Sequence, residues 1–360
     1  MTEQHALVTG GVDTHKDTLA VAALNAIGGL LGQEEFSATP AGYRSLLTWL
    51  SQYGQVVRVG VEGTGSYGAG LSRYLRAQSI VVVEVDRPDR RLCRQRGKSD
   101  PVDAVAADRA AQAETATGTP KAGTGPVESI RALRVARRSA VKARTQAANQ
   151  LHALVVRAPE PLRTTLRSLS RADLVRTAAA LRPGPSLAEP VNGTKAALRA
   201  VARRYQALHA EIVELDGQLM PLVTAAAPAL LELPGIGIEI AGQLLVTAGD
   251  NPDRLRNEAS FAALCGVSPL PASSGKNSGR HRLNRGGDRA ANSALYLAVL
   301  NRKRYNAKTR DYVARRTTEG LSNREITRCL KRYLAREVYR LLTAPAGPRS
   351  HQTNDLPRAA

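Results

Sequence analysis

The sequence predicts three regions of different kinds: an α/β domain, a stretch of long helices, and a mostly helical, basic domain. Three observations support this prediction. Apolar runs alternate with helical patterns in the first part of the chain, apolar residues recur at heptad-like spacing in the middle, and basic side chains gather toward the C-terminus. We expect an α/β domain at 1–115, a coiled-coil region at 126–226, a C-terminal domain at 227–345 and a disordered tail at 346–360.

The α/β domain is predicted from the order of its elements. Residues 6–13 and 18–24 are apolar and flank a turn-like THKD segment, which predicts a hairpin that places Asp13 at a strand end. A helical spacing follows at 40–50, and alternating valines then predict a strand that closes with Glu62. A helix, a further apolar strand and a final helix complete the set. This order of elements resembles that of a ribonuclease-H-like domain.

Four carboxylates occupy the ends of these elements. Asp13 and Glu62 each close a predicted strand, while Asp100 and Asp103 are three residues apart and share one face of a helix turn. Taken singly, each would ordinarily be a surface charge or a helix cap. As a set of hard oxygen ligands, all four could hold Mg²⁺ or Mn²⁺ against a phosphodiester. We therefore predict a metal-dependent catalytic site at these residues.

The middle of the chain has the spacing of a coiled-coil seam. Apolar residues from Leu198 to Leu222 follow one another in alternating steps of three and four. A second stretch, from Ile130 to Leu154, keeps the spacing less cleanly, because Arg137 and Arg144 occupy seam positions. We expect two long helices that pair within the chain or between subunits. Ordinary amphipathic helices in a bundle fit the same spacing equally well.

The C-terminal region opens with a Pro-Gly-Ile-Gly segment before an apolar helix. Gly235 and Gly237 in this segment predict a helix-hairpin-helix-like turn, whose backbone N–H groups can meet a phosphate. A tight turn between helices is the alternative. A polar, Gly-rich loop at 273–289 follows, and an amphipathic helix is predicted from Ile326 to Leu341.

The charge of the chain indicates a polyanionic partner. There are 51 Lys and Arg against 31 Asp and Glu, a net charge of +20, and residues 271–340 carry 18 basic and 5 acidic side chains. The arginines of the Gly-rich loop have no aromatic neighbours in the sequence, which favours phosphate contact over base stacking. The loop residues that we expect to bind nucleic acid are Lys276, Arg280, Arg282 and Arg285.

The cysteines and the hydropathy suggest a cytoplasmic location. Cys93, Cys265 and Cys329 match neither a metal-ligand spacing nor a disulfide framework, which suits a reducing compartment. No run of the sequence approaches the roughly 18 apolar residues of a membrane span. We expect a cytoplasmic protein that is associated with the nucleoid and not with a membrane.

Six motifs in order give the sequence a family resemblance. They are GVDTHKD, VEGTGSYG, KSDPVDA, LPGIG, FAALCGVSP and SSGK. Together they resemble the insertion-sequence 110 family of DEDD transposases, over roughly residues 7–342. The resemblance implies a RuvC-like N-terminal domain, a coiled-coil insertion and a C-terminal transposase domain.

The resemblance also implies roles for individual residues. Asp13, Glu62, Asp100 and Asp103 match the DEDD carboxylates of the family. Ser274 matches an essential serine that attacks the DNA phosphate, forms a covalent phosphoserine and so conserves the bond for rejoining without ATP. Its neighbour Ser273 is easily confused with it. Without the resemblance, a serine in such a loop would be taken for a solvated turn residue.

The partners implied by the resemblance are DNA, at the element ends and the target, and a noncoding guide RNA. A homodimer or homotetramer is implied as well. Two other classes of protein stay open from the residues alone. One is a hydrolytic RuvC-like Holliday-junction endonuclease, which needs no serine, and the other is a non-catalytic nucleic-acid scaffold. An actin-like sugar kinase is disfavoured by the basic C-terminal half.

Overall fold

The structure is a computed structural model that describes residues 6–85, 99–114, 116, 118–272, 281–282, 284 and 286–344. The chain divides into two compact units, each made of two stretches of sequence. The first unit comprises Met1–Gly125 and Ala248–Phe261, and the second comprises Pro126–Thr247 and Ala262–Ala360. The first contains a mixed sheet with helices, and the second is almost entirely helical in its described residues.

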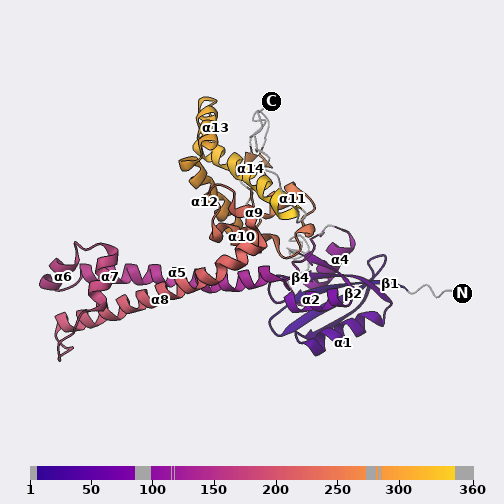
Figure 1. The fold of residues 1–360 in the computed structure, drawn as a ribbon. Helices are drawn as coiled ribbons and strands as arrows, with labels where there is room; N and C mark the ends of the chain where they lie inside the picture. The colour runs from indigo at the N-terminus through magenta and orange to yellow at the C-terminus, as the bar shows by residue number, and fades with distance from the viewer. Residues whose placement is uncertain are drawn as a thin grey trace. The chain divides into compact units, whose positions relative to one another are not determined.

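The first unit is built on a five-stranded sheet in the order β3-β2-β1-β4-β5. Its strands β1, β2 and β4 are labelled in Figure 1. Strand β1 pairs antiparallel with β2 and parallel with β4, and β4 pairs parallel with β5. The parallel pairs require helical crossovers between their strands. The elements are β1 (Leu7–Thr14), β2 (Thr18–Asn25), β3 (Leu30–Ser37), α1 (Pro40–Ser51), β4 (Gln55–Glu62), α2 (Ala69–Ala77), β5 (Val81–Val85) and α4 (Asp100–Gln112).

Side chains of β2 show how both faces of the sheet are covered. Leu19 and Val21 point to one face, where they join an apolar core with side chains of α1 and α2. Ala20 and Ala22 point to the other face and pack against Ala104 of α4. Successive strand residues alternate between faces, so the all-apolar run of β2 fits a strand that is buried on both sides.

Two glycines allow α4 to lie directly on the sheet. A Cβ atom at Gly11 of β1 would lie 2.1 Å from the carbonyl oxygen of Ala104. A Cβ atom at Gly60 of β4 would lie 2.5 Å from the carbonyl oxygen of Ala107. Any side chain at either position would therefore push the helix away. This close approach fixes α4, and with it Asp100 and Asp103, against the two central strands.

The predicted mixed α/β region and the predicted helical C-terminal region are both confirmed. One strand was not predicted: β3, residues Leu30–Ser37, is an edge strand with mostly exposed side chains. Its sequence, LLGQEEFS, has no regular alternation of apolar and polar residues. Half-exposed edge strands carry little of the burial pattern on which such predictions depend.

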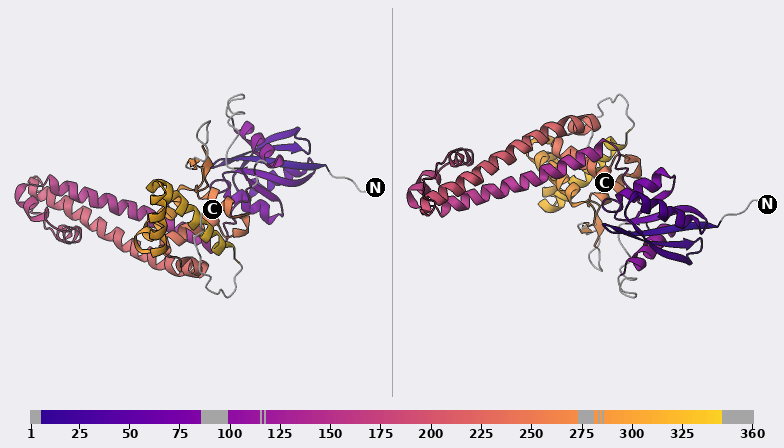
Figure 2. Two further views of the ribbon diagram at one scale, coloured as in Figure 1. Left: turned by 90° about the horizontal axis from the view of Figure 1, so that it is seen from above. Right: turned by 90° about the horizontal axis from the view of Figure 1, so that it is seen from below.

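Two long helices of the second unit run antiparallel to each other, α5 (Pro126–Val156) and α8 (Pro190–Ala226). Figure 2 shows them side by side from two directions. As residue numbers increase along α5, the numbers of the contacted residues in α8 decrease. The contacts are Arg137–Asp216, Arg144–His209 and Gln150–Arg204. The pairing within the chain is thus established, while the finer coiled-coil assignment stays a prediction.

The two arginines at seam positions have specific partners. Arg137 Nη2 donates to Asp216 Oδ2 at 3.2 Å. Arg144 Nη1 lies 2.9 Å from His209 Nδ1, and its guanidinium sits 5.9 Å from the ring centroid of Tyr205. Charge pairing and cation–π contact therefore replace apolar packing where the seam carries arginine.

Shorter helices complete the described part of the chain. Helix α12 packs against both α13 and α14. Among the described residues, no helix has the length and apolar content that crossing a bilayer would require. The remaining elements are α6 (Glu160–Leu166), α7 (Arg171–Ala179), α9 (Pro228–Leu231), α10 (Ile238–Ala248), η1 (Pro252–Arg254), α11 (Glu258–Leu264), β6 (Leu270–Pro271), β7 (His281–Arg282), α12 (Arg289–Tyr305), α13 (Ala307–Thr318) and α14 (Asn323–Thr343).

Candidate metal centre and nucleic-acid interface

Two of the predicted carboxylates lie on neighbouring strands. The parallel register pairs Val12 of β1 with Val61 of β4, so Asp13 and Glu62 follow at the same level of the sheet. The hydroxyl of Thr14 donates to the backbone oxygen of Glu62 at 2.9 Å and ties the two strand ends together. Carboxyl ends of parallel strands are where sites form in open α/β sheets.

The other two carboxylates belong to the first turn of α4. The helix begins after Ser99, and Pro101 occupies a position that tolerates proline because no intrahelical N–H bond is lost there. Asp103 is only 3% exposed, whereas half of the Asp100 side chain is exposed. Both carboxylates lie at the N-terminal end of the helix, where its dipole favours negative charge.

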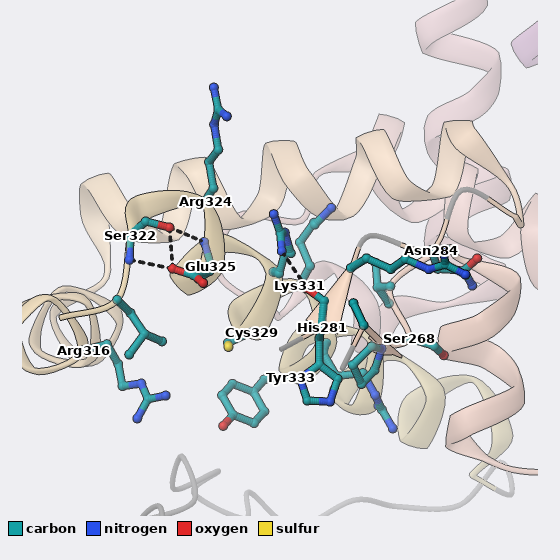
Figure 3. Close-up of a pocket in the computed structure, with 18 residues that line it drawn as sticks. Ser268, His281, Asn284, Arg316, Ser322, Arg324, Glu325, Cys329, Lys331 and Tyr333 are labelled. Carbon is teal, nitrogen blue, oxygen red and sulfur yellow. Dashed lines mark hydrogen bonds between the residues drawn. The ribbon is translucent and has the colours of Figure 1, made fainter. Parts of the chain in front are cut away.

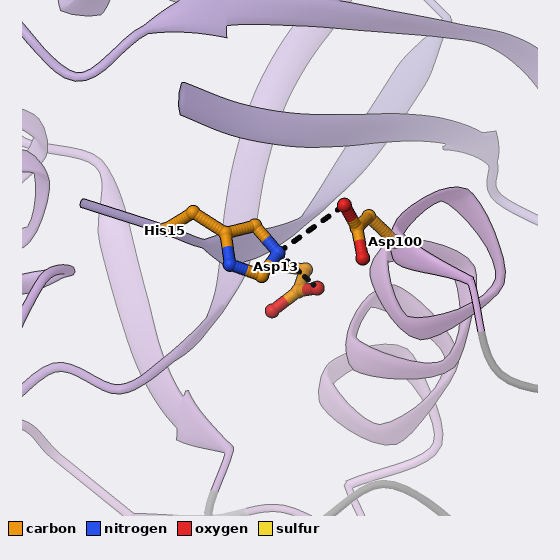
Figure 4. A group of neighbouring side chains, drawn as sticks. All are labelled: Asp13, His15 and Asp100. Atoms are coloured by element: carbon orange, nitrogen blue, oxygen red, sulfur yellow. Dashed lines mark ion pairs between the residues drawn. The ribbon is translucent and has the colours of Figure 1, made fainter. Parts of the chain in front are cut away.

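A histidine that the sequence prediction did not include joins the carboxylates. The Nε2 atom of His15 lies 3.3 Å from Asp13 Oδ2 and 3.3 Å from Asp100 Oδ2 (Figure 4). Ligand atoms of these three residues all lie within 4.8 Å of one another. The available signal was the spacing of two residues between Asp13 and His15, which puts their side chains on one side of an extended chain.

The electrostatics of this group suit a cation. Burial raises the pKa of Asp13 above its ordinary value; His15 opposes that rise, and the charges of Asp103 and Asp100 add to it. Carboxylates that repel one another in a partly buried place are stabilised by a positive ion. Two carboxylates and an imidazole are ligands of divalent metals such as Mg²⁺, Mn²⁺ and Zn²⁺. The donor set therefore fits a divalent metal ion.

The structure brings together part of the predicted site. Asp13 and Asp100 belong to the three-residue group with His15, and the charge of Asp103 acts on Asp13. Glu62 lies at the adjacent strand end but is not a member of that three-residue group. The metal-binding role of all four carboxylates therefore stays a prediction.

One of the predicted loop residues, Arg282, is among the described residues. Arg282 lies on the short strand β7 and is exposed. The others fall outside the described residues, so their predicted roles as nucleophile or phosphate contacts stay predictions. They are Ser273, Ser274, Lys276, Arg280 and Arg285.

The two glycines before α10 differ in their surroundings. Gly235 has φ +80°, and a Cβ atom there would lie 2.8 Å from the carbonyl oxygen of Ala298 in α12. Arg302 Nε donates to the backbone oxygen of Pro234 at 2.7 Å and holds the turn on the same helix. Turn geometry and packing thus account for Gly235. A Cβ atom at Gly237 would meet nothing within 4 Å, so its backbone is approachable.

Two family profiles match separate parts of the chain. A family profile described as DEDD transposase of the IS110 type matches residues 10–158. A second profile, described as transposase of the IS116/IS110/IS902 family, matches residues 227–314. The mixed sheet and the helical C-terminal region are compatible with a transposase of the DEDD class. The chain belongs to the IS110 family of transposases.

Two relatives from insertion elements are similar to this chain. The 42 kDa protein of insertion element IS900 from Mycobacterium paratuberculosis is 28% identical over 152 residues, which is 42% of this chain and 37% of the relative. The 43.6 kDa protein of insertion element IS110 from Streptomyces coelicolor is 30% identical over 146 residues, 40% of this chain and 35% of the relative. The alignments thus span little more than a third of each relative.

Proposed function

We propose that this protein is a DNA transposase, a site-specific recombinase of an insertion sequence that cuts and rejoins DNA through a serine–phosphodiester intermediate. The observation that carries this proposal is the convergence of Asp13, Asp100 and His15 at the strand ends of a mixed sheet, in a chain of the IS110 family. The strong positive charge of the C-terminal region supports DNA as the substrate.

The acidic site would hold Mg²⁺ or Mn²⁺. The residues that would bind it are Asp13, Glu62, Asp100 and Asp103, with His15 beside them. When bound, the metal supplies positive charge that neutralises the carboxylates and stabilises negative charge on phosphate oxygens. The two strand ends and α4 support this site. The close packing of α4 on Gly11 keeps Asp103 near Asp13.

The serine would perform the exchange chemistry. The hydroxyl of Ser274 loses its proton as its oxygen bonds to phosphorus, and the bond from phosphorus to the leaving DNA oxygen breaks. That leaving oxygen takes up a proton. Because the phosphodiester is conserved as a phosphoserine ester, a DNA hydroxyl can later reverse the step and release the serine. No external energy source is consumed.

The choice of DNA site would come from a noncoding guide RNA, and two subunits or more would act together as a homodimer or homotetramer. The described residues include no base-reading module that we can identify, so pairing with RNA is the simpler route to sequence choice. Positive charge suits RNA as well as DNA.

A hydrolytic Holliday-junction endonuclease is the second candidate. The acidic site on a ribonuclease-H-like sheet favours it, because such a site can activate water without any serine. The two candidates differ in the product: the transposase leaves protein attached to DNA, and the hydrolase leaves none.

Denaturing electrophoresis distinguishes the candidates. The protein is incubated with Mg²⁺, element-junction DNA, target DNA and transcript of the flanking noncoding region, and labelled DNA is examined for covalent protein. We expect an adduct that Ser274→Ala removes. Ser273→Ala is the matched control and should keep it. Strand cuts without an adduct that survive Ser274→Ala would establish the hydrolase instead.

A further inference from the structure

A basic pocket lies in the second unit, and none of its lining residues belongs to the acidic site. Its volume is about 840 Å³, and it lies between the β6–β7 pair, the C-terminal part of α13 and the N-terminal half of α14 (Figure 3). Glu325 supplies the one carboxylate among the described lining residues. The arginines and the lysine that line the pocket are Arg282, Arg316, Arg324, Arg328, Lys331 and Arg332.

The single carboxylate has a structural role. Glu325 Oε2 accepts the backbone N–H of Ser322 at 2.9 Å and its hydroxyl at 2.6 Å, which forms a capping box at the start of α14. Arg316 is paired with Glu319 outside the lining, and the other five cations against one lining carboxylate still leave the pocket positive. An anionic ligand would relieve the repulsion among these cations.

Three of the cations form a row. Arg324, Arg328 and Lys331 are four and three residues apart, so they lie on one face of α14. At 1.5 Å of rise per residue, the row spans about 10 Å along the helix. A row of charges along a groove fits a chain of phosphates better than a single anion. The volume of about 840 Å³ likewise exceeds the needs of one phosphate ion.

Two members of the row are held in place by neutral groups. Lys331 is only 7% exposed, and its Nζ donates to Asn292 Oδ1 at 2.8 Å. The amide of Asn292 is fixed in turn by hydrogen bonds to the backbone oxygens of Cys265 and Gly266. Arg328 Nη1 donates to the backbone oxygen of His281 at 3.4 Å. These contacts orient the cations without neutralising them.

The partly buried lysine is a costly feature for the unliganded protein. Burial lowers the pKa of Lys331, and the charge of Arg328 lowers it further. A desolvated ammonium group with a neutral partner is less stable than one in water. A phosphate in the pocket would offset that cost and make the charged form favourable.

We propose that this pocket binds the sugar–phosphate backbone of a DNA strand, with Arg324, Arg328 and Lys331 facing successive phosphates. The inference rests on the proposed function for its choice of DNA over other polyanions. In sequence, β6 and β7 border the segment that contains Ser274, so a strand bound here belongs to the substrate of that serine. The contacts are to phosphate, and they therefore position DNA without reading its sequence.

Equilibrium binding tests the proposal in the Ser274→Ala protein, where no covalent adduct can complicate the titration. The test variant adds Arg282→Gln, Arg324→Gln and Arg328→Gln. The control variant adds Arg171→Gln, Arg203→Gln and Arg340→Gln, which remove the same charge from exposed positions outside the pocket. Lys331 is kept, because its substitution could disturb packing. Fluorescence anisotropy of a labelled DNA duplex and of a single strand is measured over a range of salt concentrations.

We expect the test variant to bind DNA at least about tenfold more weakly than the control at 0.1 M salt, with a salt dependence reduced by about 0.9 in log–log slope per lost contact. Thermal melting should match that of the control. Equal affinity in the two variants would overturn the proposal. Displacement of DNA by millimolar inorganic phosphate would also overturn it, because it would indicate a single-anion site.

An RNA arm fixes the identity of the strand. A labelled RNA of the same length is titrated in parallel, and a loss of DNA binding with RNA binding kept would support DNA as the occupant. If only RNA binding falls, the occupant is RNA and the proposal for DNA is wrong. Failure of the proposed function looks different: wild-type protein would bind DNA through this pocket and still form no covalent adduct.

Discussion

The acidic site and the basic pocket are opposite in charge and similar in construction. At the first, Asp13, Asp100 and Asp103 gather negative charge at strand and helix ends. At the second, Arg328 and Lys331 gather positive charge on one helix face. Each concentrates like charges that a folded protein without ligand would avoid. The difference in sign matches the two ligands that we propose: a divalent cation for one and a phosphate chain for the other.

The largest effect is expected for a substitution of Asp13 at the acidic site. Asp13→Asn should reduce adduct formation by at least about a thousandfold, or about 4 kcal/mol, because a ligand and a charge are lost together. The melting temperature should rise, since the raised pKa of Asp13 means that its charged form is disfavoured by folding. Gel assays and calorimetry measure both effects. A variant that loses activity by unfolding would contradict this interpretation.

The next largest effect is expected at Gly11, where α4 packs closely on the sheet. In Gly11→Ala the new Cβ meets the backbone of α4 at 2.1 Å, so we expect about 3 kcal/mol of lost stability in urea titrations. Gly65→Ala is the matched control, because a Cβ there meets nothing within 4 Å. Equal stability of the two variants would show that α4 does not depend on this close approach.

A buried carboxylate further along α4 has a smaller expected effect, which depends on pH. Asp108 of α4 is 0% exposed, and burial raises its pKa to about 7, against an opposing effect of the Thr9 hydroxyl. The folded-state pKa lies above the unfolded value of 3.8, so folding favours the protonated form. Stability from this group is full below about pH 4 and is lost as pH rises through about 7.

The corresponding substitution is Asp108→Asn. It should leave the free energy of unfolding nearly unchanged at pH 4 and raise it by about 2 kcal/mol at about pH 5.5. Urea titrations across that pH range measure the change. A gain that is the same at both pH values would rule out titration of Asp108 as its cause.

The smallest expected effect concerns His15. An imidazole nitrogen suits Mn²⁺ better than Mg²⁺. His15→Gln should therefore raise the Mn²⁺ concentration needed for half-maximal adduct formation by about tenfold, or about 1.4 kcal/mol, and change the Mg²⁺ requirement less. Equal changes for both metals would assign His15 a purely structural role.

Local patterns predicted the parts of the fold that depend on local burial. The alternating valines before Glu62 and the apolar run of β2 became strands, and the spacing from Leu198 to Leu222 became a helix face. The edge strand β3 lacked such a pattern. Carboxylates at strand ends were predictable because strand ends are visible in the sequence.

The features that were not predicted depend on contacts between distant segments. The basic pocket needs β7, α13 and α14 to meet, and no single stretch of sequence shows this. The buried guanidinium of Arg134 is a similar case: its Nη2 donates to Gln243 Oε1 at 3.0 Å, 109 positions along the chain. In the sequence Arg134 looks like one more surface charge of a basic helix. Whether such a residue is buried depends on its contacts with distant parts of the chain.

The most direct test of the serine mechanism is to locate the attached DNA. The covalent protein–DNA adduct is digested with nuclease and protease, and the peptide that carries the nucleotide remnant is sequenced by mass spectrometry. We predict that the remnant is attached to Ser274. A remnant on Ser273 would move the nucleophile by one residue. A remnant on no serine, together with cut DNA, would contradict the proposed mechanism.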